Sequence, residues 1–209
     1  MERRLAIKWM LAAAASTAFG ISGGIGAGST VAGQGPAAGY GTDPDLQRDY
    51  HPGDLWPLTF DGNQRRIAAR LCDLIIPADA ESPSATQVGV DKFIDEWISA
   101  PYLGHLEDRK VVLAGLAWIS AESVRRFGAD FPDLVLSQCN SLCDDICYLQ
   151  KARPEHMEGA HFFKRFRDLV AGGFYTTQEG MRDIGYVGNV PSASFDGPPE
   201  SALKMLGLN

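Results

Sequence analysis

Apolar residues recur at helical spacing in five separate stretches between residues 61 and 170. In each stretch they return every three or four positions, which is the period of one face of an α-helix. No stretch sustains the alternation of apolar and polar residues that a half-buried strand requires. The sequence therefore predicts an all-α fold, with helices over residues 61–76, 90–100, 106–127, 135–148 and 155–170.

Local signals mark the ends of two of these helices. Asp61 and Gln64 can form a capping box at the start of the first helix, and Pro77 ends it. Gly172 and Gly173 are expected to cap the C-terminal end of the fifth. The segment GGFYTTQEGMRDIGYVGNVP is then too rich in glycine to stay regular, and a short helix is expected over residues 201–206. We thus expect a compact bundle of about five helices with an irregular, coil-rich C-terminal segment.

The first residues of the chain have the anatomy of an export signal. Arg3, Arg4 and Lys8 form a basic start, and an apolar run from Trp9 to Ile21 follows. That run is shorter than the about 20 residues that a membrane-spanning helix needs. Paired arginines followed by apolar positions and a lysine resemble the twin-arginine motif. An ordinary secretory signal is the alternative.

Composition divides the chain into three segments. We expect residues 1–32 to be a twin-arginine-type signal peptide, residues 33–58 a Gly/Pro-rich tether and residues 59–209 the helical domain. Cleavage near Ala27, cleavage near Ala32 and an uncleaved leader that acts as an anchor all stay open.

Four cysteines are the first candidates for chemistry. Cys139, Cys143 and Cys147 lie four residues apart, so one helix face presents all three, but no CxxC pair accompanies them. In an oxidising compartment we expect Cys72 to form a disulfide with one of the three. Cys139 is then the candidate for an outward-facing thiol that bonds to a partner chain. A metal site on the cysteine face is the weaker alternative, and no metal is predicted.

The remaining polar residues form no recognisable catalytic set. His51, His105, His156 and His161 are predicted to lie on the surface, and the sequence contains no GxSxG, HExxH or P-loop motif. The adjacent Asp144 and Asp145 point to different sides of a helix and so make no catalytic pair. The net charge of −7 argues against a nucleic-acid partner, which requires a basic face.

The C-terminal segment is unusually aromatic for a loop. Phe174, Tyr175 and Tyr186 lie within it, and Trp56 lies at the end of the tether. Aromatic side chains on irregular segments are typical of protein interfaces. We therefore predict a partner interface at these four residues, with packing back onto the helical core as the alternative.

Two blocks of the sequence resemble one protein family. RRIAARLCDLIIPADAESPSATQVGVDKFIDEWISAPY is similar to the N-terminal signature of the gluconate 2-dehydrogenase subunit 3 family, with an IIP step before a loop and a V-x-x-F-I-D helix after it. HFFKRFRDLVAGGFYTTQEGMRDIGYVGNVP is similar to the C-terminal block, which carries a Phe pair, a Gly-Phe-Tyr step and a Gly-Tyr-x-Gly element. The resemblance covers about residues 60–208, and a twin-arginine-like leader is typical of the family.

The resemblance implies a function that the residues alone do not name. Family members are small, non-catalytic subunits of periplasmic dehydrogenases whose large subunit is an FAD enzyme of the glucose–methanol–choline type, acting on a sugar, glycoside or polyol. A cytochrome c often accepts the electrons. The small subunit helps the large one to fold and carries it through the twin-arginine translocase. We therefore expect no cofactor in this chain, FAD in the partner, and a periplasmic location with attachment to the membrane through the complex or the leader.

Two other functions stay open on the sequence. One is a free-standing periplasmic binding or scaffold protein. The other is an enzyme in its own right that uses the cysteine face to hold a metal.

Overall fold

The fold is known from a computed structural model that describes residues 50–186, 188, 194, 197–198 and 200–208. Within these residues every regular element is a helix and there is no strand, which confirms the all-α prediction. Seven α-helices are described: α2 (Gly62–Ile75), α3 (Val90–Ser99), α4 (Leu103–Phe127), α5 (Leu136–Ile146), α6 (Met157–Tyr175), α7 (Gln178–Asp183) and α8 (Glu200–Leu206).

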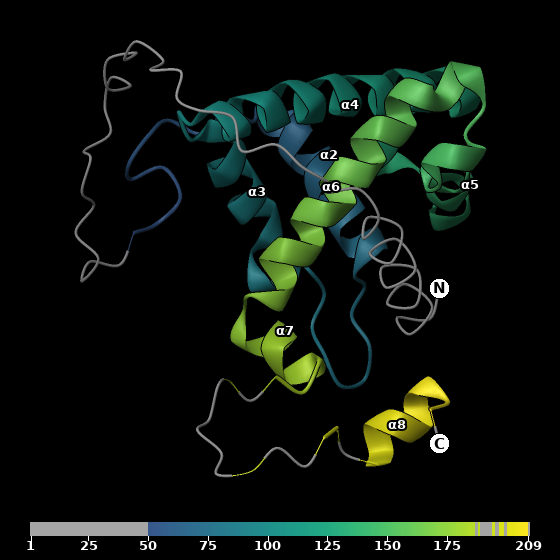
Figure 1. Cartoon of the computed structure of the whole chain (residues 1–209). Helices are drawn as coiled ribbons and strands as arrows, with labels where there is room; N and C mark the ends of the chain where they lie inside the picture. Colours follow the sequence, from purple (N-terminus) through teal and green to yellow (C-terminus); the bar gives the residue numbers. More distant parts are fainter. Residues whose placement is uncertain (1–49, 187, 189–193, 195–196, 199, 209) are drawn as a thin grey trace, which may run out of the picture.

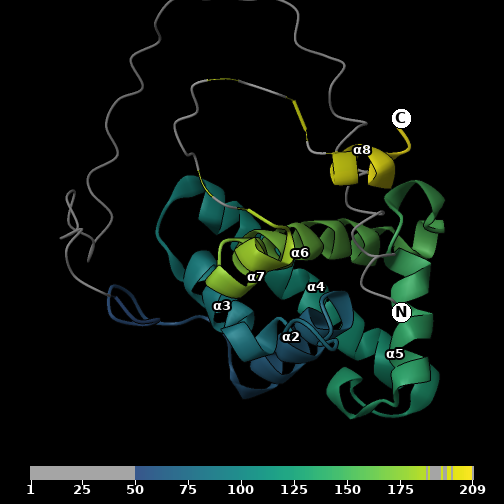
Figure 2. The same cartoon turned by 90° about the horizontal axis from the view of Figure 1, so that it is seen from below.

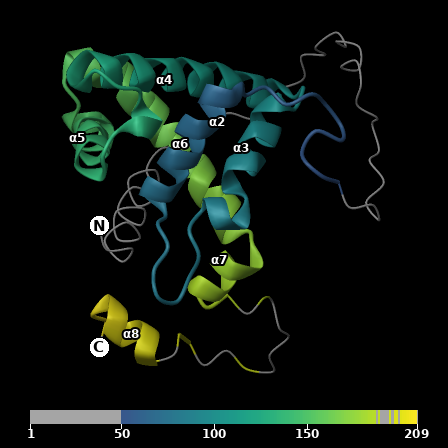
Figure 3. The same cartoon turned by 180° about the vertical axis from the view of Figure 1, so that it is seen from behind.

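The long helix α4 organises the bundle. It lies along one edge, and α2, α3 and α6 run away from it on the same side (Figure 1). The view from behind places α2 in front of α6, so the two helices form successive layers (Figure 3). Helix α5 packs at the C-terminal end of α4, and α7 lies at the far end of α6 (Figure 2). The core fills the space between α2, α3, α4 and α6.

The predicted start and stop signals of the first helix are confirmed. Gln64 donates its backbone N–H to the Asp61 carboxylate at 2.8 Å, and the Gln64 side chain accepts the Asp61 N–H at 2.9 Å. This capping box satisfies two of the donors that every helix start leaves free. The helix ends at Ile75, with Pro77 two residues beyond.

Two glycines set the closest contact in the bundle, where α4 crosses α6. A Cβ atom on Gly115 of α4 would lie 1.8 Å from the Cγ of Phe162, which is fully buried on α6. A Cβ atom on Gly159 of α6 would lie 2.5 Å from the Trp118 ring of α4. Each helix therefore offers a notch into which an aromatic ring of the other fits, and only glycine leaves that notch open.

The expected end of the fifth helix is wrong. Helix α6 does not stop at Gly172 and Gly173 but continues through both to Tyr175. Gly173 faces Phe93 of α3, whose ring would come within 2.6 Å of a Cβ atom there. The glycine thus serves close helix packing rather than a cap, and the burial of α6 against α3 outweighs the weak helix propensity of glycine.

The glycine notches predict opposite effects for two single-methyl substitutions. Gly115→Ala forces a methyl group into Phe162 and should lower the free energy of unfolding by about 1–3 kcal/mol. Gly172→Ala adds the same methyl group to α6 at a position with nothing within 4 Å, and should raise it by up to about 1 kcal/mol. Urea denaturation of the two variants measures both changes. Equal effects would show that the crossing is not the tight point of the fold.

Candidate functional site

A chain of aromatic rings runs along α3 and is the most distinctive surface feature of the domain. The rings of His105 and Trp97 are stacked, with centroids 4.0 Å apart, and Phe93 lies 5.8 Å beyond Trp97. In the other direction, Tyr102 lies 5.3 Å from His105 and Trp56 lies 6.2 Å from Tyr102. We call these five residues the aromatic strip. Tyr102 is the most open of them, with 41% of its surface exposed.

Three elements supply the strip. Phe93 and Trp97 are four residues apart on α3, so they share one helix face. Tyr102 is the N-cap of α4, and His105 lies in the first turn of that helix. Trp56 comes from the segment that precedes α2. The α3–α4 connection is short, which brings the two helix ends together and lets the rings touch.

The segment of residues 51–60, which we call the strap, is held against α3 by hydrogen bonds. Gly53 donates its N–H to the Glu96 carboxylate at 2.8 Å, and the Trp56 indole donates to the Glu96 carbonyl at 3.2 Å. The buried Asp95 carboxylate accepts the backbone N–H groups of Thr59 and Phe60 at 3.0 and 2.9 Å. These bonds fix the point at which the N-terminal part of the chain joins the bundle.

A carboxylate beneath the strip ties three helices together. Asp108 of α4 accepts two hydrogen bonds from the Arg165 guanidinium of α6, at 2.6 and 2.5 Å, and one from the Trp97 indole of α3 at 2.8 Å. The hydrogen bonds from Arg165 hold the pKa of Asp108 below its ordinary value. A forked pair of this kind fixes orientation as well as distance, so Trp97 is held in one position.

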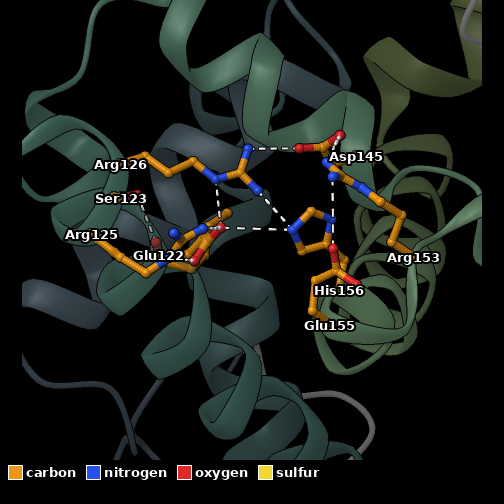
Figure 4. Close-up of polar contacts among 9 residues, drawn as sticks. Glu122, Ser123, Arg125, Arg126, Asp145, Arg153, Glu155 and His156 are labelled. Atoms are coloured by element: carbon orange, nitrogen blue, oxygen red, sulfur yellow. Dashed lines mark hydrogen bonds and ion pairs between the residues drawn. The ribbon is translucent and has the colours of Figure 1, made fainter.

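A second charge cluster lies at the other end of α4 (Figure 4). Glu122 accepts hydrogen bonds from Arg125, at 2.6 Å, and from Arg126, at 2.5 Å. Arg126 also donates to Asp145 of α5 at 2.6 Å. The hydrogen bond from Arg125, together with the neighbouring Arg126, lowers the pKa of Glu122 to about 2. The cluster therefore joins α4 to α5 through charges that stay ionised at neutral pH.

His156 belongs to this cluster, and the prediction that it lies on the surface is wrong. Only 4% of its surface is exposed. Its Nε2 lies 2.9 Å from a nitrogen of Arg126, and because a guanidinium can only donate, Nε2 accepts. Its Nδ1 is buried and has no hydrogen-bond partner among the described residues. His156 ends a short 3₁₀ helix (Pro154–His156) that precedes α6, so the spacing expected for an α-helix says nothing about its environment.

The structure separates the four residues predicted to form an interface. Phe174 is fully buried, which contradicts its assignment to a partner surface. It follows Phe166 and Val170 at four-residue spacing on the continued α6, so it points into the core. Tyr175 and Trp56 are partly buried, and 54% of Tyr186 is exposed. Tyr186 thus remains the most accessible of the four, and the interface itself stays a prediction.

All four cysteines are free thiols in the structure, so the expected disulfide from Cys72 is not formed. Cys72 lies on α2, whereas Cys143 lies on α5. Burial raises the pKa of both thiols and keeps them protonated at neutral pH.

Cys139 does not face outward as predicted. It is fully buried, and its thiol lies 3.8 Å from the carbonyl oxygens of Phe131 and Leu134. Cys143 and Cys147 are the partly exposed members of the three. Among the described residues, no three His, Cys, Asp or Glu side chains are grouped so as to hold a metal ion.

The predicted export residues Arg3, Arg4 and Lys8 lie outside the described residues. Within the described part of the chain, no helix combines the length and apolar character needed to cross a membrane.

Comparison with known proteins gives one match. The family described as gluconate 2-dehydrogenase subunit 3 matches residues 62–197, which is more than half of the chain. Searches of curated proteins and of solved structures found no match. The matched region starts at α2 and ends before α8, so the bundle with both charge clusters and most of the aromatic strip lies inside it.

Removal of the Asp108 charge beneath the aromatic strip should destabilise the bundle. Asp108→Asn leaves the Arg165 guanidinium without its counter-charge, and should lower the free energy of unfolding by about 1–3 kcal/mol. Glu107→Gln is the matched control, because Glu107 pairs with Lys110 on the open surface of the same helix, and such a pair contributes less than about 1 kcal/mol. Urea denaturation compares the two variants. A larger loss from Glu107→Gln would contradict the assignment.

The Glu122 cluster predicts how stability depends on pH. The pKa of Glu122 is lower in the folded chain than the about 4.3 of an unfolded one, so its contribution is present above that unfolded value. It is lost as the pH falls from about 5 toward about 2. The difference in unfolding free energy between wild type and Glu122→Gln should therefore shrink over this range. Thermal denaturation from pH 7 to 2 measures it, and a difference independent of pH would contradict the prediction.

Proposed function

The chain belongs to the gluconate 2-dehydrogenase subunit 3 family and is thus a subunit of a dehydrogenase complex, and on this basis we propose that it is the small, non-catalytic subunit of a periplasmic FAD-dependent enzyme. The large subunit is of the glucose–methanol–choline type, binds the FAD and oxidises a sugar, glycoside or polyol. This chain stabilises the folded large subunit and accompanies it through the twin-arginine translocase. A cytochrome c accepts the electrons.

The way in which the buried charges are used supports a structural role. Asp95, Asp108 and Glu122 expose little of their side chains, and each accepts hydrogen bonds. The bonds to Asp95 and Asp108 join separate elements, whereas those to Glu122 come from Arg125 and Arg126 of its own helix. Asp95 holds the strap, Asp108 joins three helices, and Glu122 positions Arg126. Their common effect is to make the bundle rigid, which suits a surface that another chain must recognise.

The mechanism is one of linked equilibria. A subunit that binds only the folded form of the large chain shifts that chain toward its folded state, by an amount that grows with the concentration of the subunit. The twin-arginine route exports chains that are already folded. A leader carried by the small subunit can therefore serve both chains, provided that they associate first.

The strap connects this mechanism to the structure. Its hydrogen bonds to Asp95 and Glu96 attach the tether to α3, close to the aromatic strip. A pull on the leader is thus transmitted to a helix of the rigid bundle. The export signal lies at the other end of the tether and is formed by Arg3, Arg4 and Lys8.

A single experiment tests partnership and export together. The chain is tagged at its C-terminus, expressed with its native neighbours and recovered from the periplasm. We expect a larger flavoprotein to accompany it, with a flavin spectrum that bleaches when the correct sugar or polyol is added. Arg3→Lys with Arg4→Lys should leave the complex intact but retain it in the cytoplasm, lowering periplasmic flavoprotein by about tenfold or more.

The outcomes separate the parts of the proposal. A stable, colourless wild-type monomer would exclude the subunit role and favour a free-standing scaffold. A flavoprotein that reaches the periplasm equally well with the double lysine variant would exclude the shared leader but leave the partnership intact.

A further inference from the structure

We propose that this chain binds the catalytic subunit through its C-terminal arm, by which we mean Ile184, Tyr186, helix α8 and Leu208. The matching surface on that subunit is an apolar groove edged by cationic side chains. The inference rests on the proposed function, since it names the contact through which the two chains associate.

Exposed apolar side chains are concentrated in the arm. Among the described residues, eleven large hydrophobic side chains are exposed, and five of them belong to the arm: Ile184, Tyr186, Met205, Leu206 and Leu208. Met205 is the most exposed of all, at 86%. The other six are spread over α4, the residue before it and the start of α5. Exposed apolar side chains that gather on one part of the chain are typical of sites of association.

Helix α8 is amphipathic although it buries no residue within the chain. Ala202, Leu203, Met205 and Leu206 fall on one side of the helix, and Glu200, Ser201 and Lys204 fall on the other. A polar face and an apolar face on so short a helix indicate a surface against which the apolar face packs. Figures 1 and 3 show α8 apart from the bundle, which indicates that the bundle does not provide that surface.

The length of α8 supports an external partner. The helix has seven residues, whereas isolated helices shorter than about 12–15 residues are marginal in water. Tertiary packing supplies most of the stability of helices in proteins. Within α8 only Ala202 and Leu203 are partly covered and no residue is fully buried, so we assign the missing packing to another chain.

Helix α8 and the residues Ile184, Tyr186 and Leu208 offer several exposed apolar side chains, and a partner interface requires a set of such anchors rather than one.

Charge at the base of the arm defines the rest of the partner surface. The loop after α2 and helix α7 enclose a groove of about 280 Å³, lined by Glu81, Ser82, Pro83, Glu179, Arg182 and Asp183. Three carboxylates and one guanidinium face this groove, so its net charge is negative. A lysine or arginine of the partner complements the negative charge of this groove next to the apolar contact. The pair fixes the orientation of the arm on the partner surface.

The test compares two pairs of substitutions in the full chain, co-expressed with the catalytic subunit. Met205→Asp with Leu206→Asp places two charges on the apolar face of α8. Leu103→Asp with Leu136→Asp is the matched control, because both leucines are exposed, at 76% and 57%, and each is the first residue of its helix. Both pairs add the same charge and should leave the melting temperature of the isolated chain unchanged, since none of the four side chains is buried.

We expect the arm pair to weaken binding of the catalytic subunit by about 30-fold or more, as is typical when anchoring apolar residues are lost. The control pair should change it by less than about threefold. The first measurement of binding is the amount of flavin that co-purifies with each tagged chain. Hydrogen exchange gives the second: the amides of residues 200–206 should exchange fast in the isolated chain and become protected in the complex.

Three results would overturn the inference. Binding unchanged by the arm pair, in a wild type that does recover the flavoprotein, removes the arm from the interface and leaves the proposed function standing. Protection of residues 200–206 in the isolated monomer shows that the arm packs on its own bundle. A dimer of the isolated wild-type chain that the arm pair dissociates shows that a second copy occupies the arm. Failure of the wild type to recover any flavoprotein counts against the proposed function, because it arises before any substitution is made.

Discussion

The close crossing of α4 and α6 is the constraint on which the rest of the structure depends. Gly115 and Gly159 let the two helices approach until Phe162 and Trp118 fill each other's notches. At this separation the Arg165 guanidinium on α6 forms its hydrogen bonds with Asp108 on α4. The same approach brings His156, in the turn before α6, to Arg126 near the end of α4. The glycines set the distance, and the charges then fix rotation and register, which apolar packing alone specifies poorly.

The positions of the two charge clusters explain how the aromatic strip is kept in place. One cluster lies near each end of α4: the Asp108–Arg165 pair joins this helix to α6, and the Arg126–Asp145 pair joins it to α5. The helix therefore cannot shift against these two neighbours without breaking an ion pair. Buried ion pairs contribute little net stability, because desolvation offsets most of the attraction. Their value here is geometric: Asp108 also holds the Trp97 indole, just as the Glu96 carbonyl holds that of Trp56. The strip is thus a surface with few accessible conformations.

The sequence alone predicts the parts of the fold that depend on local pattern. The helical segments and the Asp61 capping box follow from spacing and cap chemistry, and both are confirmed. Errors arise where contacts between distant segments decide the outcome. Gly173 is helical because Phe93 packs against it, and this carries Phe174 into the core. His156 and Cys139 are buried because turns fold over them, and no periodicity reports that. The Asp108–Arg165 pair joins residues 57 positions apart, so the sequence offered no signal for it.

The contrast between the rigid bundle and the unburied arm bears on how a subunit can distinguish a folded partner from an unfolded one. Formation of α8 costs conformational entropy that the chain itself does not offset, because none of its residues is buried. Only a continuous apolar groove on the partner can compensate for this cost, and such a groove exists only after the partner has folded. Scattered apolar residues of an unfolded chain contact one or two side chains of the arm, which is too little to order the helix. In our proposal, an arm that orders only on binding makes association conditional on a folded partner surface, as the proposed export of folded complexes requires.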